Sequence, residues 1–281
     1  MRIGLFTDAP KHNLALMKIS AWHKAQGDEV TLNQPLGRYD LTCGSWLFDF
    51  NGHYPADING GPGYDPLVRL PADIEAMKPD YSLYRVDYSL GSTWEYCPQR
   101  CGFCVVPKQN NPRVHRSIWD FHVPRFEVIC LLNNNTFSDP QWRETFEEIW
   151  DANLIVRDEN GYDLRLLNDE KAEALKRTRF KGQIHFAWDR LADEAQIRKG
   201  LDIARRWKLR ATVYVLMGYD SSFDEDIYRC QVIHDYGLDP FPMLYRRTLA
   251  LRRFRRFIYL RFYRQYPTLR EAWEDYHSLR R

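Results

Sequence analysis

Apolar residues follow two different periods along this chain, and the two periods alternate. Near the N-terminus, residues 2–7 form a short apolar run typical of a strand, whereas residues 14–26 repeat their apolar positions at helical spacing and end at Gly27. Residues 29–32 and part of residues 39–50 predict two more strands. Together these elements predict a small Rossmann-like α/β unit.

A stretch rich in glycine and proline follows this unit. Residues 57–65 read Asp-Ile-Asn-Gly-Gly-Pro-Gly-Tyr-Asp, which predicts a loop, and Pro71 and Pro79 continue the irregular segment. We therefore expect a boundary near residue 80. The expected division is a Rossmann-like unit with its linker at residues 1–80, a core at residues 81–245 and a basic, aromatic helical segment at residues 246–281.

The core alternates strand-like and helix-like segments. The expected strands are residues 89–96, 126–132, 154–158, 183–188, 211–217 and 241–245. The expected helices are residues 142–152, 169–178, 194–208 and 223–236. Such alternation with short connections implies an α/β fold with a parallel sheet and right-handed crossovers, and six such units can form a partial (β/α)6 barrel. We expect functional residues in the loops at the carboxyl ends of the strands.

Composition narrows the class of protein. With 44% hydrophobic and 15% aromatic residues among 281, a disordered chain is excluded. No apolar run approaches the roughly 18 residues of a membrane span, so no membrane partner is expected. The first residues lack a basic n-region and a long apolar h-region, and we therefore expect a cytoplasmic protein. The net charge of +2 means that any argument for nucleic-acid binding must depend on local charge.

Three of the six cysteines lie within eight residues, directly after the expected strand 89–96. These are Cys97, Cys101 and Cys104, and a tight cluster in a cytosolic chain is typical of metal binding. Three thiolates at this spacing can hold an iron–sulfur cubane, which normally takes four and would here keep one iron open. The alternative is zinc with His115 as a fourth ligand, although a second C-x2-C is missing.

The remaining cysteines, Cys43, Cys130 and Cys230, are too far apart in the sequence to predict a second cluster. We expect each of them to be a small buried apolar residue.

The cysteine spacing, with Phe103 just before the last cysteine, resembles the signature of the radical SAM superfamily. This resemblance implies a radical SAM barrel whose open iron binds S-adenosylmethionine. One electron, from a reductant such as flavodoxin or ferredoxin, then yields a 5′-deoxyadenosyl radical that abstracts a substrate hydrogen. More narrowly, the chain is similar to short radical SAM proteins with a truncated N-terminal domain related to cobalamin-binding ones. The segments that carry this similarity include NLALMKISAWHKAQGD, GGPGYD, PDYSLY, LLNNNTFSDP, GYDLRLLNDEKA, GQIHFAWD and YVLMGYDSSFDED.

The resemblance also implies roles for individual polar residues. The methionyl amino group is expected to contact the run of three amides after the second strand, at Asn133, Asn134 and Asn135. The alternative is an Asn-rich turn that caps a helix. Arg165 is expected near the carboxylate or ribose of S-adenosylmethionine, and Asp163 near the ribose. The alternative for Arg165 is an ion pair with Asp163 or Glu170.

Residues of the fourth and fifth strands complete the implied site. Met217, Gly218 and Phe103 are expected near the adenine, with a core or turn role as the alternative for each. Alternation along the strand puts His185 on the same side as Asp189. Facing inward, the two could transfer a proton to or from substrate; facing outward, His185 is simply a hydrogen-bonded strand histidine.

No D-x-H-x-x-G motif occurs in the N-terminal unit, so cobalamin is not predicted.

The C-terminal segment suggests a class of substrate, because residues 246–264 interleave arginine with aromatic residues. The arginines are 246, 247, 252, 253, 255, 256, 261 and 264, and the aromatics are Phe254, Phe257, Tyr259, Phe262 and Tyr263. One interpretation is a closing helix with an apolar face of Leu251, Phe254, Ile258 and Phe262, whose arginines pair with acids elsewhere. The other is phosphate contact with base stacking.

The sequence therefore predicts a radical SAM enzyme with one [4Fe–4S] cluster that modifies a nucleotide or nucleic-acid base. There are two alternatives. One is a radical SAM enzyme that acts on a peptide or small metabolite, and the other is a non-catalytic binding module whose fold is stabilised by a bound metal.

Overall fold

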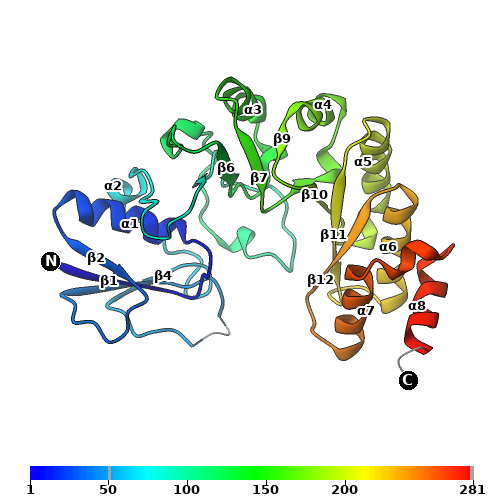
Figure 1. Cartoon of the computed structure of the whole chain (residues 1–281), viewed down its shortest axis with the longest axis horizontal. Helices are drawn as coiled ribbons and strands as arrows, with labels where there is room; N and C mark the ends of the chain where they lie inside the picture. Colours follow the sequence, from blue (N-terminus) through cyan, green and yellow to red (C-terminus); the bar gives the residue numbers. More distant parts are fainter. Residues whose placement is uncertain (50–51, 279–281) are drawn as a thin grey trace. The chain divides into compact units, whose positions relative to one another are not determined.

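The computed structural model of the chain describes residues 1–49 and 52–278. It confirms an α/β fold with parallel sheets (Figure 1). The chain divides into two compact units, which are described separately below. The first unit comprises Met1–Asn134 and Glu147–Val156, and the second comprises Asn135–Phe146 and Arg157–Arg281. The expected division at residues 80 and 245 stays a prediction, as does the partial barrel.

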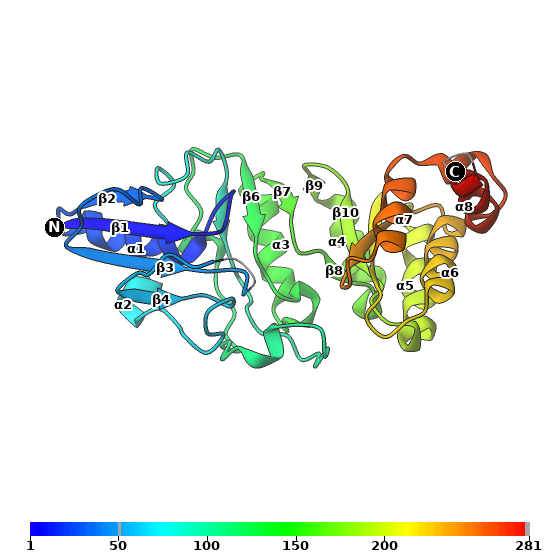
Figure 2. The ribbon, with the colours of Figure 1, turned by 90° about the horizontal axis from the view of Figure 1, so that it is seen from below.

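The N-terminal sheet has four parallel strands in the order β2-β1-β3-β4. Its elements are β1 (Arg2–Thr7), α1 (Leu14–Ala25), β2 (Glu29–Leu32), β3 (Leu41–Ser45) and β4 (Ile58–Gly60). Helix α1 packs against β2 and β3 (Figure 2). Its Leu16 is buried with Ile3, Leu5 and Cys43. The first three of these elements are confirmed within a residue of their predicted ends. Phe50, the last residue of the range expected to hold the third strand, lies outside the described residues.

Strand β4 corrects one prediction, because its three residues fall inside the stretch that we expected to be a loop. Cys43, Gly44 and Ser45 of β3 are in register with Ile58, Asn59 and Gly60 of β4. The ladder itself is made by backbone groups, so the apolar pattern of a Gly-rich segment carries no signal for it.

Strands β5 and β6 of the first unit are also parallel. The sheet that contains them has the order β5-β6-β7-β9, with bounds Ser89–Gly91, Val128–Leu131, Ile155–Asp158 and Arg179–Phe180. Helix α3 (Trp142–Asp151) precedes β7, and the short helix α2 (Ala72–Glu75) precedes β5. Leu90 and Cys130 are buried with Met17, Tyr81 and Tyr88. Strand β5 is shorter than the predicted strand 89–96, because side chains rather than a neighbouring strand bind the backbone of residues 93–95.

The sheet of the second unit is parallel throughout, in the order β12-β11-β10-β8. Its strands are β8 (Tyr162–Asp163), β10 (Ile184–Ala187), β11 (Ala211–Met217) and β12 (Asp239–Leu244), and its helices include α4 (Asp169–Arg177), α5 (Glu194–Arg206) and α6 (Phe223–Asp235). Helix α6 packs on β11 and β12 (Figure 1). Side chains alternate along the strands: Phe186 and Val213 are fully buried, whereas His185 and Tyr214 are half-buried.

The C-terminal segment is helical, with α7 (Leu249–Tyr259), a 3₁₀ turn (Phe262–Gln265) and α8 (Leu269–Ser278). The predicted apolar face of α7 is confirmed for Leu251, Phe254 and Ile258, which are buried. Phe262 lies beyond the end of α7 and does not belong to this face. Residues 279–281 of the predicted segment lie outside the described residues. None of the helices within residues 1–49 and 52–278 has the length and apolar content needed to cross a bilayer.

Candidate functional site

The cysteine-bearing loop follows β5 in the first unit. Cys97, Cys101 and Cys104 are all half-buried, so reagents and ions can reach this part of the chain. The N–H of Cys104 donates to the carbonyl of Cys101 at 3.0 Å, which makes a tight turn between them. The N–H of Val106 then donates to Sγ of Cys104 at 3.4 Å.

The three scattered cysteines are buried, as predicted. Burial raises the pKa of Cys43 to about 11, with Asp57 adding to the effect. Burial likewise raises the pKa of Cys230. A thiol that resists ionisation is a poor nucleophile and metal ligand, so these cysteines belong to the core.

Two of the three predicted amides fix the start of the cysteine loop. Oδ1 of Asn133 accepts from the N–H groups of Thr93 and Trp94 at 2.8 and 3.1 Å, and its Nδ2 donates to Oγ1 of Thr93 at 2.9 Å. Nδ2 of Asn134 donates to the carbonyl of Glu95 at 2.5 Å. These bonds use the amides to position backbone, which favours a turn role over the predicted contact with the methionyl group.

The same loop is closed at its base by Arg69. Its guanidinium donates to Oε2 of Glu95 at 2.7 Å and to Oδ1 of Asn111 at 3.0 Å. Glu95 also pairs with Arg116 at 3.0 Å. The chain between residues 95 and 111, which carries all three clustered cysteines, is therefore tied at both ends to one arginine.

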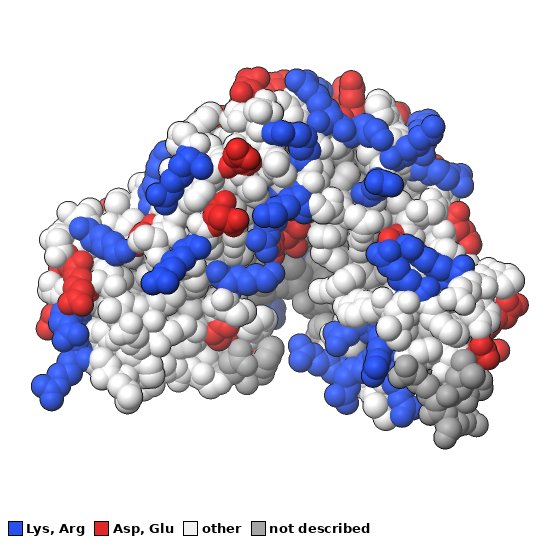
Figure 3. Space-filling view, in the orientation of Figure 1, with Lys and Arg blue, Asp and Glu red and all other residues white. Residues whose placement is uncertain are grey.

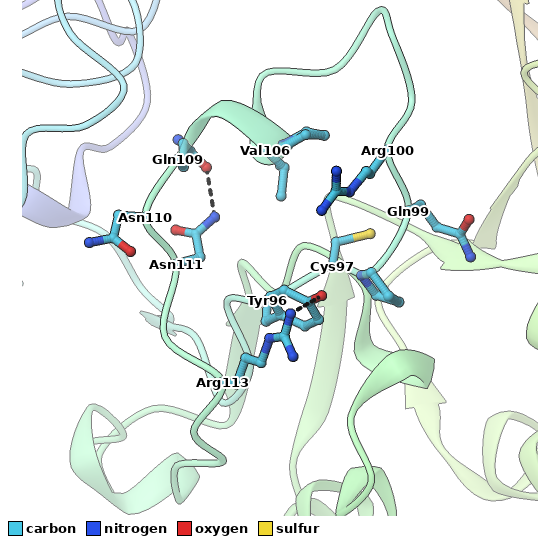
Figure 4. A pocket seen from close by; sticks show the side chains of 11 residues that line it. Tyr96, Cys97, Gln99, Arg100, Val106, Gln109, Asn110, Asn111 and Arg113 are labelled. Carbon is cyan, nitrogen blue, oxygen red and sulfur yellow. Dashed lines mark hydrogen bonds between the residues drawn. The ribbon is translucent and has the colours of Figure 1, made fainter.

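A cavity of about 420 Å³ opens beside this loop (Figure 4). Cys97 points into it, and Arg100 and Arg113 line it. The Arg113 guanidinium lies 4.2 Å from the centroid of the Tyr96 ring and donates to its hydroxyl at 2.8 Å. The lining is thus polar and cationic, which suits an anionic ligand better than an apolar one. Cys101, Phe103 and Cys104 are half-buried elsewhere on the loop and do not line this cavity.

The donor set of the loop fits a thiolate-bound cluster in its chemistry, because three accessible thiols follow one parallel strand. In the described ranges, however, no group of three His, Cys, Asp or Glu side chains is arranged so that it could hold a metal ion. The thiols would therefore need to converge when a cluster binds.

A second group of predicted residues meets in the second unit. Asp163 ends β8, and its carboxylate accepts from Arg165 Nε at 2.8 Å and from a terminal nitrogen of Arg165 at 2.9 Å. Arg165 also pairs with Asp193 at 3.2 Å, and Asn135 Nδ2 donates to Asp163 at 3.1 Å. The bidentate pair is the alternative that the sequence left open for Arg165, whereas Glu170 pairs with Arg143 instead. A guanidinium so engaged presents less of its surface to a ligand.

Asp189 follows β10 and is half-buried beside this pair. Burial raises the pKa of Asp189 to about 6, while Arg165 and Arg229 oppose the rise. A carboxyl group that exchanges its proton near neutral pH is suited to general acid–base chemistry. The carbonyl of Asp189 accepts from Arg229 at 2.7 Å, so the backbone that carries this carboxyl is fixed.

Arg229 is a neighbour of the candidate site that the sequence did not indicate. It lies in α6, is fully buried, and donates to the carbonyls of Trp188 at 2.9 Å and of Leu216 at 2.7 Å. It also pairs with the carboxylate of Asp226 in the same helix. The sequence did carry a sign of this buried pair. Asp226 and Arg229 lie three residues apart on the same side of α6 as the apolar residues Cys230 and Ile233.

His185 contacts Asp158 rather than Asp189. The backbone N–H of His185 donates to Oδ2 of Asp158 at 2.8 Å, and the ring atom Nδ1 lies 3.1 Å from the backbone carbonyl of Asp158. The imidazole ring stacks on Tyr214. This matches the hydrogen-bonded strand histidine that the sequence left open. The ring still lies on the half-buried side of the sheet.

The residues after β11 are packed. The side chain of Met217 is fully buried and therefore offers no exposed surface to a ligand. Its predicted contact with adenine stays a prediction. Gly218 has a φ of +73°, and a Cβ there would lie 2.8 Å from Cδ1 of Leu251 in α7. Its N–H donates to Asp226 at 3.2 Å. The positive φ of this turn therefore favours glycine, and the contact with the end of the Leu251 side chain is a smaller constraint.

Comparison with known proteins adds no identity to these geometric findings: no protein-family model matches the chain, and no curated protein matches it.

Proposed function

We propose that this protein is a radical SAM enzyme with one [4Fe–4S] cluster held by Cys97, Cys101 and Cys104. The observation that carries the proposal is the contrast between two sets of cysteines. The clustered three are half-buried on a loop directly after a parallel strand, whereas the scattered three are buried in the core. When bound, the cluster would supply the electron that cleaves S-adenosylmethionine to a 5′-deoxyadenosyl radical.

The chain's own residues would prepare and shield this chemistry. Asn133 and Asn134 hold the start of the cysteine loop through its backbone, and Arg69 ties residue 95 to residue 111. Arg100 and Arg113 line the cavity beside Cys97 and would attract an anionic group there. In the second unit, Asp189 would accept or release a proton, because its pKa lies near neutrality.

The substrate that we propose is a nucleotide or a nucleic-acid base. Arginines crowd α7 and the turn before it, and phosphate is the anion that such a concentration of guanidinium groups suits. A flavodoxin- or ferredoxin-like reductant would supply the electron.

Anaerobic reconstitution of the full chain with iron and sulfide tests the proposal. We expect about four irons per chain and, after dithionite and S-adenosylmethionine are added, release of 5′-deoxyadenosine. Cys97→Ala, Cys101→Ala and Cys104→Ala should each lose the cluster, whereas the matched control Cys130→Ala should keep it. Zinc as the sole bound metal, or full iron loading by all three cluster variants, would contradict the proposal.

A further inference from the structure

Aromatic rings form a continuous row across the sheet of the second unit. His185 of β10 stacks on Tyr214 of β11 with centroids 5.0 Å apart. Tyr214 meets Phe241 of β12 at 5.3 Å, and Phe241 meets Tyr259 of α7 at 5.1 Å. Each ring comes from the next element along, so the row ends on the arginine-rich helix.

This row lies on the less buried side of the sheet. The strand neighbours of Tyr214, Val213 and Val215, are fully buried on the other side, whereas Tyr214 and Phe241 are half-buried. Tyr259 is 50% exposed. Part of the ring surface along the row is therefore exposed to solvent, whereas rings in a closed core would be fully buried.

Three arginines of α7 flank the exposed end of the row. Arg252, Arg255 and Arg256 precede Tyr259 by seven, four and three residues, so they share its side of the helix. The Arg255 guanidinium lies 5.9 Å from the centroid of the Tyr259 ring. Figure 3 shows Lys and Arg side chains gathered over this part of the chain.

The arginines of α7 and its preceding turn are distinguished by their lack of acidic partners within the described residues. Among the described residues, no acidic side chain forms an ion pair with any of the six arginines of α7 and its preceding turn, which are Arg246, Arg247, Arg252, Arg253, Arg255 and Arg256. Later arginines behave differently: Arg261 and Arg264 pair with Asp239, and Arg270 pairs with Asp224. The interpretation that the arginines of α7 pair with acids elsewhere is therefore wrong for these six within the described ranges.

Three of the five predicted tail aromatics cannot supply the stacking surface that the sequence suggested. Phe254, Phe257 and Tyr263 are buried between α7 and α8 with Trp273 and Tyr276. Of the predicted tail aromatics, Tyr259 is the exposed one that also joins the row across the sheet.

We propose that the row His185–Tyr214–Phe241–Tyr259, together with Arg252, Arg255 and Arg256, binds a single strand of nucleic acid. The arginines would neutralise phosphates, and the rings would stack on bases, which only an unpaired strand can offer. A duplex keeps its bases stacked on one another and would use the arginines alone. This deepens the proposed function by naming an unpaired strand as the substrate form and by giving it a docking surface.

Fluorescence anisotropy with a labelled 20-nucleotide strand, and with the same strand in a duplex, tests the binding surface. We use the full chain without iron or S-adenosylmethionine, so failure of binding is separate from failure of cluster assembly. The single strand should bind more tightly than the duplex at 0.15 M salt. Arg252→Gln/Arg255→Gln/Arg256→Gln should reduce the slope of log affinity against log salt by about 2, since each phosphate contact contributes roughly 0.7 on a single strand. The matched control, Arg205→Gln/Arg206→Gln on α5, should leave the slope unchanged.

The ring variants test stacking itself. Tyr259→Leu should weaken single-strand binding about tenfold, whereas Tyr259→Phe should retain it. Tyr228→Leu, which removes a 42% exposed ring on α6, is the control and should bind like the wild type. Equal affinity for strand and duplex, unchanged affinity in Tyr259→Leu, or an unchanged salt slope in the triple arginine variant would each overturn the proposal.

Discussion

The two units hold their strand ends by different means. In the first unit, neutral amides and half-buried ion pairs bind the cysteine loop near its base, through Asn133, Asn134 and Arg69. In the second unit, the ends of β10 and β11 are joined by one fully buried guanidinium, that of Arg229, which is itself paired with Asp226. The first arrangement combines neutral hydrogen bonds with ion pairs that solvent partly reaches, whereas the second depends on a fully buried charge.

This difference predicts where each unit can rearrange. A neutral hydrogen bond contributes about 1 kcal/mol net, whereas breaking a buried ion pair costs about 3–5 kcal/mol. The second unit is therefore fixed at its strand ends. The cysteine loop can change shape beyond its base at small cost, which is what convergence of three thiols on the proposed cluster would require.

The largest effect is expected for Arg229→Met, which should lower the free energy of unfolding by about 3–5 kcal/mol. The variant leaves Asp226 buried without its cation and leaves backbone carbonyls without a donor. Urea unfolding measures the change. The double variant Asp226→Leu/Arg229→Met should recover part of the loss, because no lone charge remains. The exposed control Arg205→Met should change the free energy of unfolding by less than about 0.5 kcal/mol. An equal loss of stability in Arg229→Met and Arg205→Met would contradict the special role of the buried guanidinium.

The next effect is a pH dependence that Asp189 introduces. Its folded pKa of about 6 lies above the unfolded value of 3.8, so the native state keeps a proton that the unfolded chain has released. The free energy of unfolding should therefore fall as pH rises from about 4 to about 6, by up to about 3 kcal/mol. Asp189→Asn should remove this fall, whereas the exposed control Asp202→Asn should retain it. Urea unfolding at several pH values measures the slope, and identical slopes in wild type and Asp189→Asn would refute the assignment.

The smallest effect is expected in the first unit. Asn133→Ala should cost about 1–3 kcal/mol, because the buried N–H groups of Thr93 and Trp94 lose their acceptor. Asn134→Ala removes one bond and should cost about 1 kcal/mol or less. Hydrogen exchange at residues 93 and 94 should rise in the first variant only. A cost for Asn133→Ala as large as that of Arg229→Met would erase the contrast between the units.

Hydrophobic periodicity predicted the longer elements well. Strand β11 and helices α3, α4, α5 and α6 lie within two residues of their predicted ends, because buried and exposed positions alternate clearly in them. Strands β8 and β9 have two residues each, too few for any period to be detected. The predicted strand 89–96 was too long, since nothing in residues 92–96 reveals that amides forty residues away bind their backbone.

The candidate site was predictable by residue type and less so by partner. Cysteine spacing predicted a site at three thiols of one loop, which stays a prediction, and the exposure of these thiols separates them from the buried cysteines. The arginine that pairs with Asp163 was foreseen as an alternative, yet Asp193 and Arg229 were not. Both come from helices or turns later in the chain, and only tertiary packing brings them beside Asp163 and Asp189.

Because Gly218 has no side chain beyond a hydrogen atom, it affects which residues of α7 could change in relatives of this protein. It leaves room for Leu251, which together with the other buried side chains of α7, Phe254, Phe257 and Ile258, sets the position of this helix. The arginines on the outward surface take no part in that packing. Relatives could therefore exchange these outward residues, and with them the nucleic-acid binding that we propose for this surface, while keeping the same helix in the same place.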